Sequence, residues 1–185
     1  MKKIINAGKY DIIIEKNSLC SFGEYVKTAL GTNNAKLLIV SDDRVYSLYG
    51  DRTREALKST GFTLAEDYVF PHGEMSKNLS NLGEILRHAA DEGLTRSDCI
   101  AALGGGVTGD MAGFAAAVYL RGIKYVSVPT SILAMVDSSV GGKTAVDIPE
   151  GKNLVGAFHE PSLVLSDTAL LSTLPEDFVS DGMAE

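Results

Sequence analysis

Short apolar runs and helical patterns alternate along most of the chain. The runs with the length and composition of strands are residues 10–14, 36–40, 67–70, 99–103, 125–128 and 163–166. Between them, apolar residues recur at helical spacing in the segments 22–29, 45–49, 79–86 and 111–118. Strands that are apolar along their whole length are typical of a parallel sheet covered on both faces. The pattern therefore predicts an α/β fold with a Rossmann-like, largely parallel sheet and helices on both faces.

Residues 175–185 begin a further helical pattern, which stops at Glu185. Thr173 is the predicted N-cap of this helix, and Pro175 is predicted in its first turn. Because the pattern ends in mid-helix, we expect the sequence to be part of a longer protein.

The composition is that of a folded protein, and the charge argues against partners that need a basic surface. The 185 residues are 45% apolar and 22% charged, which is ordinary for a globular domain. The 17 Lys and Arg residues against 24 Asp and Glu residues give a net charge of −7. A nucleic acid or an acidic membrane surface would need a basic face. An anionic ligand must therefore be held by a few placed cations and backbone amides.

The cysteines and the N-terminal residues predict a soluble, cytoplasmic protein. Cys20 and Cys99 lie far apart and outside any metal-binding spacing, so we expect two reduced thiols. The first apolar run is broken by Asn6, Gly8 and Asp11, which argues against a signal peptide. No window approaches the ~18 apolar residues of a membrane span.

The segment GGGVTGD, residues 104–110, directly follows one predicted strand and directly precedes an apolar helix. Glycines at such a turn let the backbone approach a pyrophosphate, while the helix N-terminus faces its negative charge. The segment satisfies G-x-G-x-x-G, but the acidic residue expected about 20 positions later is missing. Dinucleotide binding is favoured, although not in a standard Rossmann dehydrogenase. A tight turn with positive φ is the alternative explanation for one or two of the glycines.

Two hydroxyl side chains follow the next predicted strand, in the sequence Pro129-Thr130-Ser131. The carboxyl ends of parallel strands are where α/β proteins bind ligands, so both hydroxyls are expected to face the crevice at the glycine turn. The alternative is that one of them caps the following helix.

The segment DSSVGGKT, residues 137–144, is not a P-loop. That motif needs a glycine where this chain has Asp137, and a preceding strand where SILAMVDSSV has a helical pattern. Lys152 follows Lys143 by nine residues, and Asn153 comes next. An aspartate, two lysines and an asparagine around a cleft suit a phosphorylated, polyhydroxylated substrate. A solvated surface loop is the alternative.

The segment PHGEMSK, residues 71–77, follows another predicted strand. Glu74 accepting hydrogen bonds from ribose hydroxyls would supply the carboxylate that the glycine turn lacks. In the alternative, Ser76 caps the next helix, and Glu74 and Lys77 are simply exposed. The spacing of the three histidines is not that of a metal site: they are His72, His88 and His159.

Taken together, these motifs resemble the 3-dehydroquinate synthase family. The resemblance runs from Leu103 to Glu185 through GGGVTGD, VPTS, DSSVGGKT, EGKN and the closing SDGMAE, and more loosely includes PHGEMSK. It implies an N-terminal NAD⁺-binding domain, here residues 1–174. The family's C-terminal helical domain, which holds metal and substrate, would begin in residues 175–185 and is otherwise absent from this sequence.

Members of this family convert 3-deoxy-D-arabino-heptulosonate 7-phosphate to 3-dehydroquinate and phosphate in the shikimate pathway. The resemblance implies that NAD⁺ is used catalytically and that one divalent metal, zinc or cobalt, is bound. The implied steps are oxidation of a ring alcohol, phosphate elimination, re-reduction, ring opening and an intramolecular aldol reaction. A transient ketone would acidify the adjacent C–H bond, and the metal would act as a Lewis acid.

The resemblance also implies roles for individual residues. Those implied for the cofactor are Asp42, His72, Gly73, Glu74, Lys77, Gly105, Gly106, Val107, Gly109, Asp110, Thr130, Ser131, Lys143, Lys152, Leu170 and Thr173. Those implied for the substrate and catalysis are Asp137, Lys143, Lys152, Asn153 and Arg121. Arg121 resembles an arginine that reaches the phosphate of the neighbouring subunit's substrate, which implies a homodimer. Thr130-Ser131 replaces the Thr-Thr common in the family but keeps both hydroxyls.

Glu185 matches the first metal ligand of the family, whose other ligands are two histidines that would lie beyond this sequence. One carboxylate cannot make a three-ligand zinc site. We therefore expect residues 1–185 alone neither to bind zinc tightly nor to turn over.

Two alternatives remain. Other sugar-phosphate cyclases of the same superfamily share much of the DSSVGGKT and GKN series, whereas the related dehydrogenases share mainly the glycine turn. The non-enzymatic alternative is a stand-alone dinucleotide-binding module.

Overall fold

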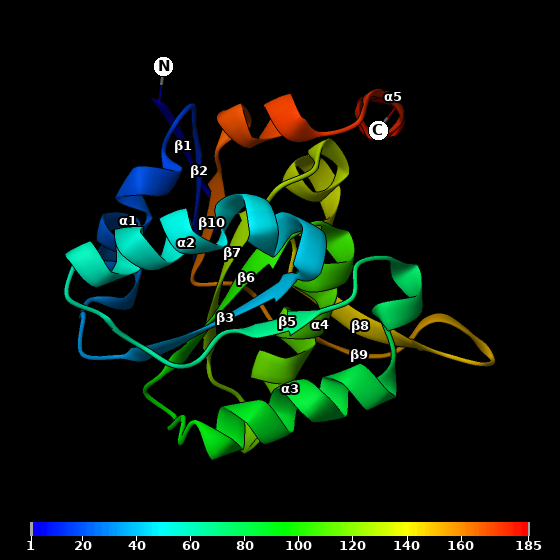
Figure 1. Cartoon of the computed structure of the whole chain (residues 1–185), viewed down its shortest axis with the longest axis horizontal. Coiled ribbons are helices and arrows are strands. Elements are labelled where there is room, and N and C mark those ends of the chain that lie inside the picture. Colours follow the sequence, from blue (N-terminus) through cyan, green and yellow to red (C-terminus); the bar gives the residue numbers. More distant parts are fainter. Residues whose placement is uncertain (1, 185) are drawn as a thin grey trace.

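A mostly parallel sheet forms the centre of the structure, a computed structural model that describes residues 2–184 (Figure 1). Its strand order is β1-β2-β10-β7-β6-β3-β4, with β5 also paired to β3. Within this sheet of the described residues, every pairing is parallel except β1 with β2. The strands are β1 (Lys2–Asn6), β2 (Asp11–Glu15), β3 (Lys36–Asp42), β4 (Thr63–Leu64), β5 (Tyr68–Phe70), β6 (Cys99–Gly104), β7 (Lys124–Pro129) and β10 (Leu163–Ser166).

Helices cover both faces of this sheet (Figure 1). α1 (Phe22–Leu30) and α2 (Asp43–Ser59) lie on one face, and α3 (Leu79–Asp91) and α4 (Gly106–Val118) lie on the other. The predicted Rossmann-like α/β fold is confirmed, and these helices occupy the segments with helical spacing. Between residues 2 and 184, no helix has the length and apolar character needed to cross a bilayer.

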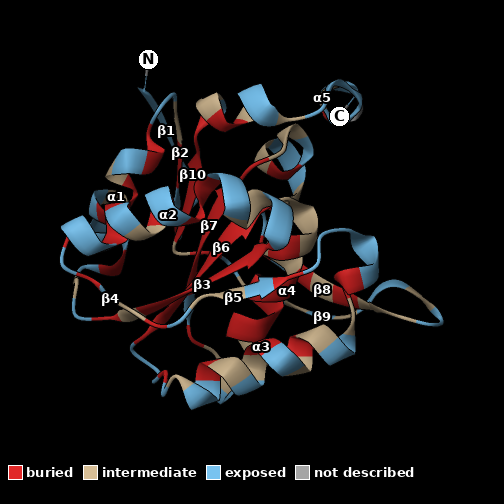
Figure 2. Cartoon of the chain, viewed as in Figure 1, coloured by how far each residue is buried: buried red, intermediate tan, exposed pale blue. Residues whose placement is uncertain are grey.

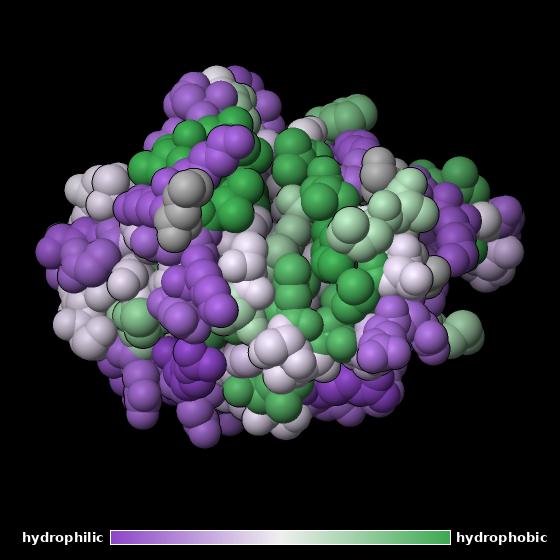
Figure 3. Space-filling model, turned by 90° about the horizontal axis from the view of Figure 1, so that it is seen from above, coloured by the Kyte–Doolittle hydropathy of each residue, from purple (hydrophilic) through white to green (hydrophobic). Residues whose placement is uncertain are grey.

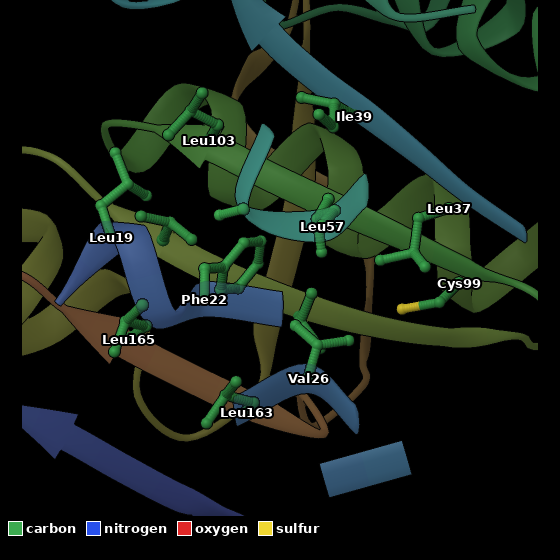
Figure 4. Close-up of a cluster of buried hydrophobic side chains, with 14 of the residues drawn as sticks. Leu19, Phe22, Val26, Leu37, Ile39, Leu57, Cys99, Leu103, Leu163 and Leu165 are labelled. Atoms are coloured by element: carbon green, nitrogen blue, oxygen red, sulfur yellow. The ribbon is translucent and has the colours of Figure 1, made fainter. Parts of the chain in front are cut away.

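The central strands are mostly apolar and are buried on both faces (Figure 2). In β3, Leu37 and Ile39 belong to the core beneath α1 and α2, whereas Leu38 and Val40 belong to the core against α3 and α4. Successive strand side chains point to opposite faces, so a doubly covered strand needs apolar residues at every position. Figure 4 shows the first core around Phe22. Burying each such side chain contributes about 1.5–3 kcal/mol.

A two-stranded antiparallel hairpin, β8 (Lys143–Ile148) and β9 (Gly151–Phe158), lies outside the main sheet. The sequence pattern did not predict it, nor the exposed edge strand β1 and the short β4. Val146, Val155 and Ala157 pack into the core that also contains α4. The hairpin is therefore stabilised mainly by packing of one face against the core, while the residues on its other face are exposed.

The last helix begins differently from the prediction. α5 spans Glu176–Met183, so Pro175 precedes it. Thr173 is not its N-cap: it ends a 3₁₀ turn (Thr168–Thr173), and its hydroxyl lies 2.5 Å from the hydroxyl of Tyr49. The N-cap prediction is therefore wrong, because a tertiary hydrogen bond to α2 engages this side chain.

The predicted helical pattern in SILAMVDSSV is confirmed and ends in a π-helical turn, Ala134–Ser138. A β-carbon at Gly182 of α5 would lie 2.6 Å from the β-carbon of Ile132, so α5 packs closely against the start of this segment. The division of the chain after residue 174 stays a prediction.

The two cysteines are expected to differ in reactivity. Cys20 is exposed, whereas Cys99 is fully buried in β6, and burial raises the pKa of its thiol to about 12. Because the thiolate is the reactive form, only Cys20 should react rapidly with DTNB at pH 8 in the native chain. Both thiols should react after unfolding in guanidinium. Cys20→Ser is the matched control and should remove the native reaction; a second rapid thiol would contradict the buried position of Cys99.

Candidate functional site

The glycine turn lies where β6 ends at Gly104 and α4 begins at Gly106. None of the glycines in GGGVTGD has a positive φ, so the explanation by a left-handed tight turn is wrong. A β-carbon at Gly104 would lie 2.3 Å from Oγ1 of Thr108, and one at Gly106 would lie 3.1 Å from Oγ of Ser138. Glycine is needed here for close packing between α4, the end of β6 and the π-helical turn.

The start of α4 has room for a ligand. Within the described residues, no side chain caps this helix, and a β-carbon at Gly109 would have no atom within 4 Å. Val107, by contrast, packs partly into the core. The free N–H groups of a helix N-terminus and the helix dipole both favour a negatively charged group. The turn therefore has the space and the polarity for a pyrophosphate.

Asp42 links the starts of α2 and α4 beneath the turn. Its Oδ1 accepts a hydrogen bond of 2.9 Å from the backbone N–H of Val45, which caps α2. Its Oδ2 accepts one of 3.3 Å from the hydroxyl of Thr108. The predicted cofactor residue Asp42 thus lies next to the glycine turn, with both carboxylate oxygens already engaged.

Thr130 and Ser131 continue this edge of the sheet. The backbone N–H of Thr130 donates to the carbonyl of Gly104 at 2.9 Å, which joins the segment after β7 to the glycine turn. The hydroxyl of Ser131 accepts from the N–H of Ala134 at 3.2 Å, so the predicted alternative of a helix cap is confirmed for this residue. The same hydroxyl lies 3.7 Å from the position of a β-carbon on Gly105 and so also borders the turn.

A cavity of about 500 Å³ opens beside the glycine turn, between α4, the π-helical turn and the hairpin. Its polar lining comes from Asp110, Asp137, Ser138, Lys143, Thr144 and Asn153. Of the four residues predicted around one cleft, Asp137, Lys143 and Asn153 line this cavity, whereas Lys152 does not. Asp110 of the glycine turn, predicted as a cofactor residue, lines it as well. Seen from above, the molecule also carries a band of hydrophobic residues on the face where both termini lie (Figures 1 and 3).

Asp137 and Lys143 form an ion pair at this cavity, with 3.1 Å between Oδ1 and Nζ. Both side chains are more than half exposed, so the pair contributes little to stability. Asp137 lies in the π-helical turn, and such turns are frequent at functional sites. Because water already competes for this pair, a ligand can replace either partner at small cost.

Lys77, in contrast, is engaged in a buried junction. Its Nζ lies 2.5 Å from Oδ2 of Asp110 and 2.5 Å from Oδ1 of Asn153, and its side chain is only 6% exposed. Burial raises the pKa of the Asp110 carboxyl, although the hydrogen bond from Lys77 opposes this shift. The predicted alternative in which Lys77 is exposed is therefore wrong.

Glu74 is exposed, so the predicted alternative is confirmed for this residue, although its side chain also contacts the hairpin. Its Oε1 lies 3.1 Å from Nζ of Lys152, and this hydrogen bond raises the pKa of the lysine. Residues Glu74–Ser76 form a short 3₁₀ turn before α3. The N-cap of α3 is Asn78, whose Oδ1 accepts from the N–H of Asn81 at 2.9 Å, so the predicted alternative of a Ser76 cap is wrong.

His72 follows β5, is exposed, and contacts the first two residues of α2. Its Nδ1 lies 2.8 Å from Oδ1 of Asp43, and its Nε2 lies 3.0 Å from Nη2 of Arg44. The hydrogen bonds from His72 lower the pKa of Asp43. Gly73 has a φ of 105°, which favours glycine at this position.

The other predicted residues lie further from the cavity. Leu170 is buried, and its carbonyl accepts a hydrogen bond of 3.1 Å from the hydroxyl of Tyr49, which also contacts Thr173. Arg121 ends a 3₁₀ turn (Tyr119–Arg121) between α4 and β7. The 13 residues of α4, about 20 Å of helix, separate it from the glycine turn. The structure does not bring Arg121 to the cavity of its own chain.

Comparison with known proteins decides the family. A family model described as "3-dehydroquinate synthase N-terminal" matches residues 67–181. The chain belongs to the 3-dehydroquinate synthase family. It is 47% identical over 182 residues to the 3-dehydroquinate synthase of Picosynechococcus sp., covering 98% of this chain and 49% of that protein. The chain thus spans about half the length of the curated relatives it matches.

Two solved structures carry the same fold. One is 2-deoxy-scyllo-inosose synthase complexed with carbaglucose-6-phosphate, NAD⁺ and Co²⁺, at 31% identity and a TM-score of 0.88; the match covers 99% of this chain and 49% of that chain. The other is 2-epi-5-epi-valiolone synthase from Streptomyces hygroscopicus subsp. jinggangensis with NAD⁺ and Zn²⁺, at 31% identity and a TM-score of 0.85; that match covers 98% and 49%. Each neighbour matches over about half its length.

The described part of this 3-dehydroquinate synthase family chain supplies no metal site. Within residues 2–184, no group of three or more His, Cys, Asp and Glu side chains is arranged to hold a metal ion. Glu185, the predicted metal ligand, lies outside the described residues. The donor set required for zinc is therefore not met by these residues.

Several polar residues that the fold uses were not predicted from the sequence. Ser138 and Thr144 line the cavity, and both lie inside the DSSVGGKT segment that was already recognised. Asp147 accepts from the backbone N–H of Asn153 at 2.7 Å and so orders the hairpin. Asp167 is fully buried at the end of β10, where it accepts backbone hydrogen bonds. A carboxylate directly after an apolar strand is the signal that could have identified Asp167.

Proposed function

We propose that the whole protein is a 3-dehydroquinate synthase. It would convert 3-deoxy-D-arabino-heptulosonate 7-phosphate to 3-dehydroquinate and phosphate in the shikimate pathway, with NAD⁺ used catalytically. The observation that carries this proposal is one cavity, beside an uncapped helix N-terminus, lined by Asp110, Asp137, Lys143 and Asn153. The identity to curated 3-dehydroquinate synthases supports it.

The glycine turn would hold the pyrophosphate of NAD⁺. The open space over Gly109 and the free N–H groups of α4 fit such a group. When bound, NAD⁺ supplies a hydride acceptor. Glu74 offers a carboxylate for ribose hydroxyls of the cofactor. Thr130 and Ser131 border the glycine turn and offer two hydroxyl groups. The full set proposed for the cofactor is Asp42, His72, Gly73, Glu74, Lys77, Gly105, Gly106, Val107, Gly109, Asp110, Thr130, Ser131, Lys143, Lys152, Leu170 and Thr173.

The cavity side chains would hold the sugar phosphate. Lys143 can donate to phosphate and hydroxyl oxygens, and Asp137 can accept hydrogen bonds from ring hydroxyls. Lys152, which pairs with Glu74 and does not line the cavity, is proposed as a further donor to the substrate. Arg121 would act on the substrate phosphate of a second copy, because α4 separates it from its own cavity. This assignment makes the working protein a homodimer. We place it in the cytoplasm, without a nucleic-acid or membrane partner, in keeping with the net charge of −7.

A divalent metal, zinc or cobalt, belongs to the proposed whole enzyme and not to the described residues. Glu185 would be one ligand, and the rest of the set would come from outside this chain. Since residues 2–184 do not supply a metal-ligand set, we infer that residues 1–185 alone do not turn over.

The first test is calorimetric titration of residues 1–185 with NAD⁺. We expect saturable binding, weakened about 10-fold in Lys143→Ala, since a charged hydrogen-bond donor beside the cofactor is lost. Lys27→Ala, an exposed lysine on α1, is the matched control and should bind as the parent does. A folded chain that binds no NAD⁺ would contradict the proposed cofactor set.

Turnover is tested separately. The whole protein should release phosphate from the heptulosonate phosphate, and residues 1–185 should release none. Steady-state phosphate release by the 185-residue chain would overturn the inference that it is inactive.

A second candidate is another sugar-phosphate cyclase. The structural neighbour with carbaglucose-6-phosphate bound is 31% identical to this chain, so the same fold serves a different ring-forming reaction. Phosphate release from glucose 6-phosphate, but not from the heptulosonate phosphate, would favour this candidate.

A further inference from the structure

Lys77 joins three elements around the cavity. Its side chain reaches Asp110 on α4 and Asn153 on β9, with 2.5 Å from Nζ to each oxygen. Its backbone carbonyl accepts from the N–H of Asp147 on β8 at 3.0 Å. The short segment before α3 is thus bonded to both strands of the hairpin and to the helix that follows the glycine turn.

The ammonium group of Lys77 fixes the orientation of the Asn153 side-chain amide. An ammonium group is only a donor, so the Asn153 atom that faces Lys77 must be its oxygen. The NH₂ group of the same amide is then free for the cavity, which Asn153 lines. Without Lys77, rotation of this amide by half a turn would exchange donor and acceptor at little cost.

The backbone of Asn153 is held by the same junction. Its φ is 58°, in the left-handed region, and its N–H donates to Oδ1 of Asp147 at 2.7 Å. Asp147 is in turn bonded to the carbonyl of Lys77. Both the backbone and the side chain of Asn153 therefore depend on Lys77, directly or through one residue.

We propose that Lys77 is a positioning residue that makes Asn153 a hydrogen-bond donor to the substrate. Asn153 then recognises an acceptor on the substrate, such as a carboxylate, phosphate or ether oxygen, and Lys77 itself does not touch the substrate. Through Asp110 the same ammonium group holds the hairpin in register with the cofactor-binding helix. This inference rests on the proposed function, because it assigns the substrate to this cavity.

The test uses the whole protein and a double-mutant cycle of Lys77→Met and Asn153→Ala. Kinetics with the heptulosonate phosphate are measured at saturating NAD⁺, so that weaker cofactor binding does not enter. Lys77→Met is expected to lower kcat/KM by about 10- to 100-fold in the parent and by less than about 3-fold in the Asn153→Ala background. Lys58→Met, an exposed lysine on α2, is the control and should match the parent.

Asn153→Asp separates the donor from the acceptor. The aspartate keeps an oxygen for Lys77 but has no N–H for the substrate, so its kcat/KM should fall as far as that of Asn153→Ala while its Tm stays near that of the parent. Parent-like activity of Asn153→Asp would overturn the assigned amide orientation. Equal losses from Lys77→Met in both backgrounds would show that Lys77 acts independently of Asn153, and would overturn the positioning role.

Failure of the proposed function would be recognised separately. If the unmutated protein turns over no sugar phosphate, the substrate assignment fails, and the same cycle is then scored by Tm. Non-additive Tm changes for Lys77→Met and Asn153→Ala would support the junction, and additive changes would overturn it.

Discussion

Gly106→Val is expected to weaken NAD⁺ binding by about 100-fold, equivalent to about 2.8 kcal/mol. Gly106 is the first residue of α4, and a β-carbon there would already lie 3.1 Å from Oγ of Ser138. The two γ-methyl groups of valine would extend over the free N–H groups that are proposed to hold the pyrophosphate, or displace the π-helical turn that carries Asp137. Calorimetric titration of the chain with NAD⁺ measures the effect.

Gly83→Val is the matched control. Gly83 lies within α3, and a β-carbon there would have no atom within 4 Å. Since valine is a better helix former than glycine, this variant should fold and bind NAD⁺ as the parent does. Unchanged NAD⁺ affinity in Gly106→Val would mean that the cofactor does not lie over the start of α4.

Asp167→Ala is expected to lower the stability of the chain by about 3 kcal/mol or more, because each buried donor left without a partner costs about 1–3 kcal/mol. Asp167 is fully buried, and its carboxylate accepts backbone N–H groups from Asn17 at 2.7 Å, Leu19 at 2.9 Å and Ala169 at 2.9 Å. These bonds tie the segment between β2 and α1 to the end of β10. In thermal unfolding, the loss should lower Tm by about 10 °C.

Two variants calibrate this result. Asp167→Asn keeps one acceptor oxygen and should lose about half as much stability. Asp51→Ala removes an exposed carboxylate on α2 and should stay within about 0.5 kcal/mol of the parent. If Asp167→Ala has the same Tm as the parent, the buried carboxylate does not stabilise the contact between the β2–α1 segment and the end of β10.

The inner strands of the main sheet were predictable because each is a run of mostly apolar residues, whereas β1 and β4 have no such run. Strands such as β3 and β6 are covered on both faces, so burial demands apolar residues at each position and produces a run that stands out. The hairpin has no such run. β9 alternates between partly buried and exposed positions and is interrupted by Gly156, whose β-carbon would lie 2.2 Å from the carbonyl of Thr144. Its pairing depends on packing against α4, which local periodicity does not record.

Motif chemistry identified much of the candidate site. Asp137, Lys143, Lys152 and Asn153 are residue types suited to a phosphorylated ligand, and all of them except Lys152 meet at one cavity, together with Asp110 of the glycine turn. The internal partners of these residues were not predictable. The pairing of Asp137 with Lys143 depends on how the π-helical turn meets β8.

By itself, the sequence determined the fold class, most strands of the main sheet, the family, and the place of the glycine turn between a strand and a helix. Each of these depends on residues close together in the chain, where spacing reflects local geometry. Only the tertiary structure decided that Lys77 is buried between Asp110 and Asn153, that Arg121 lies far from its own cavity, and that Thr173 bonds to Tyr49 instead of capping α5. Lys77 and Asn153 are 76 positions apart, and such contacts follow from how helices and strands pack, which local sequence patterns do not encode.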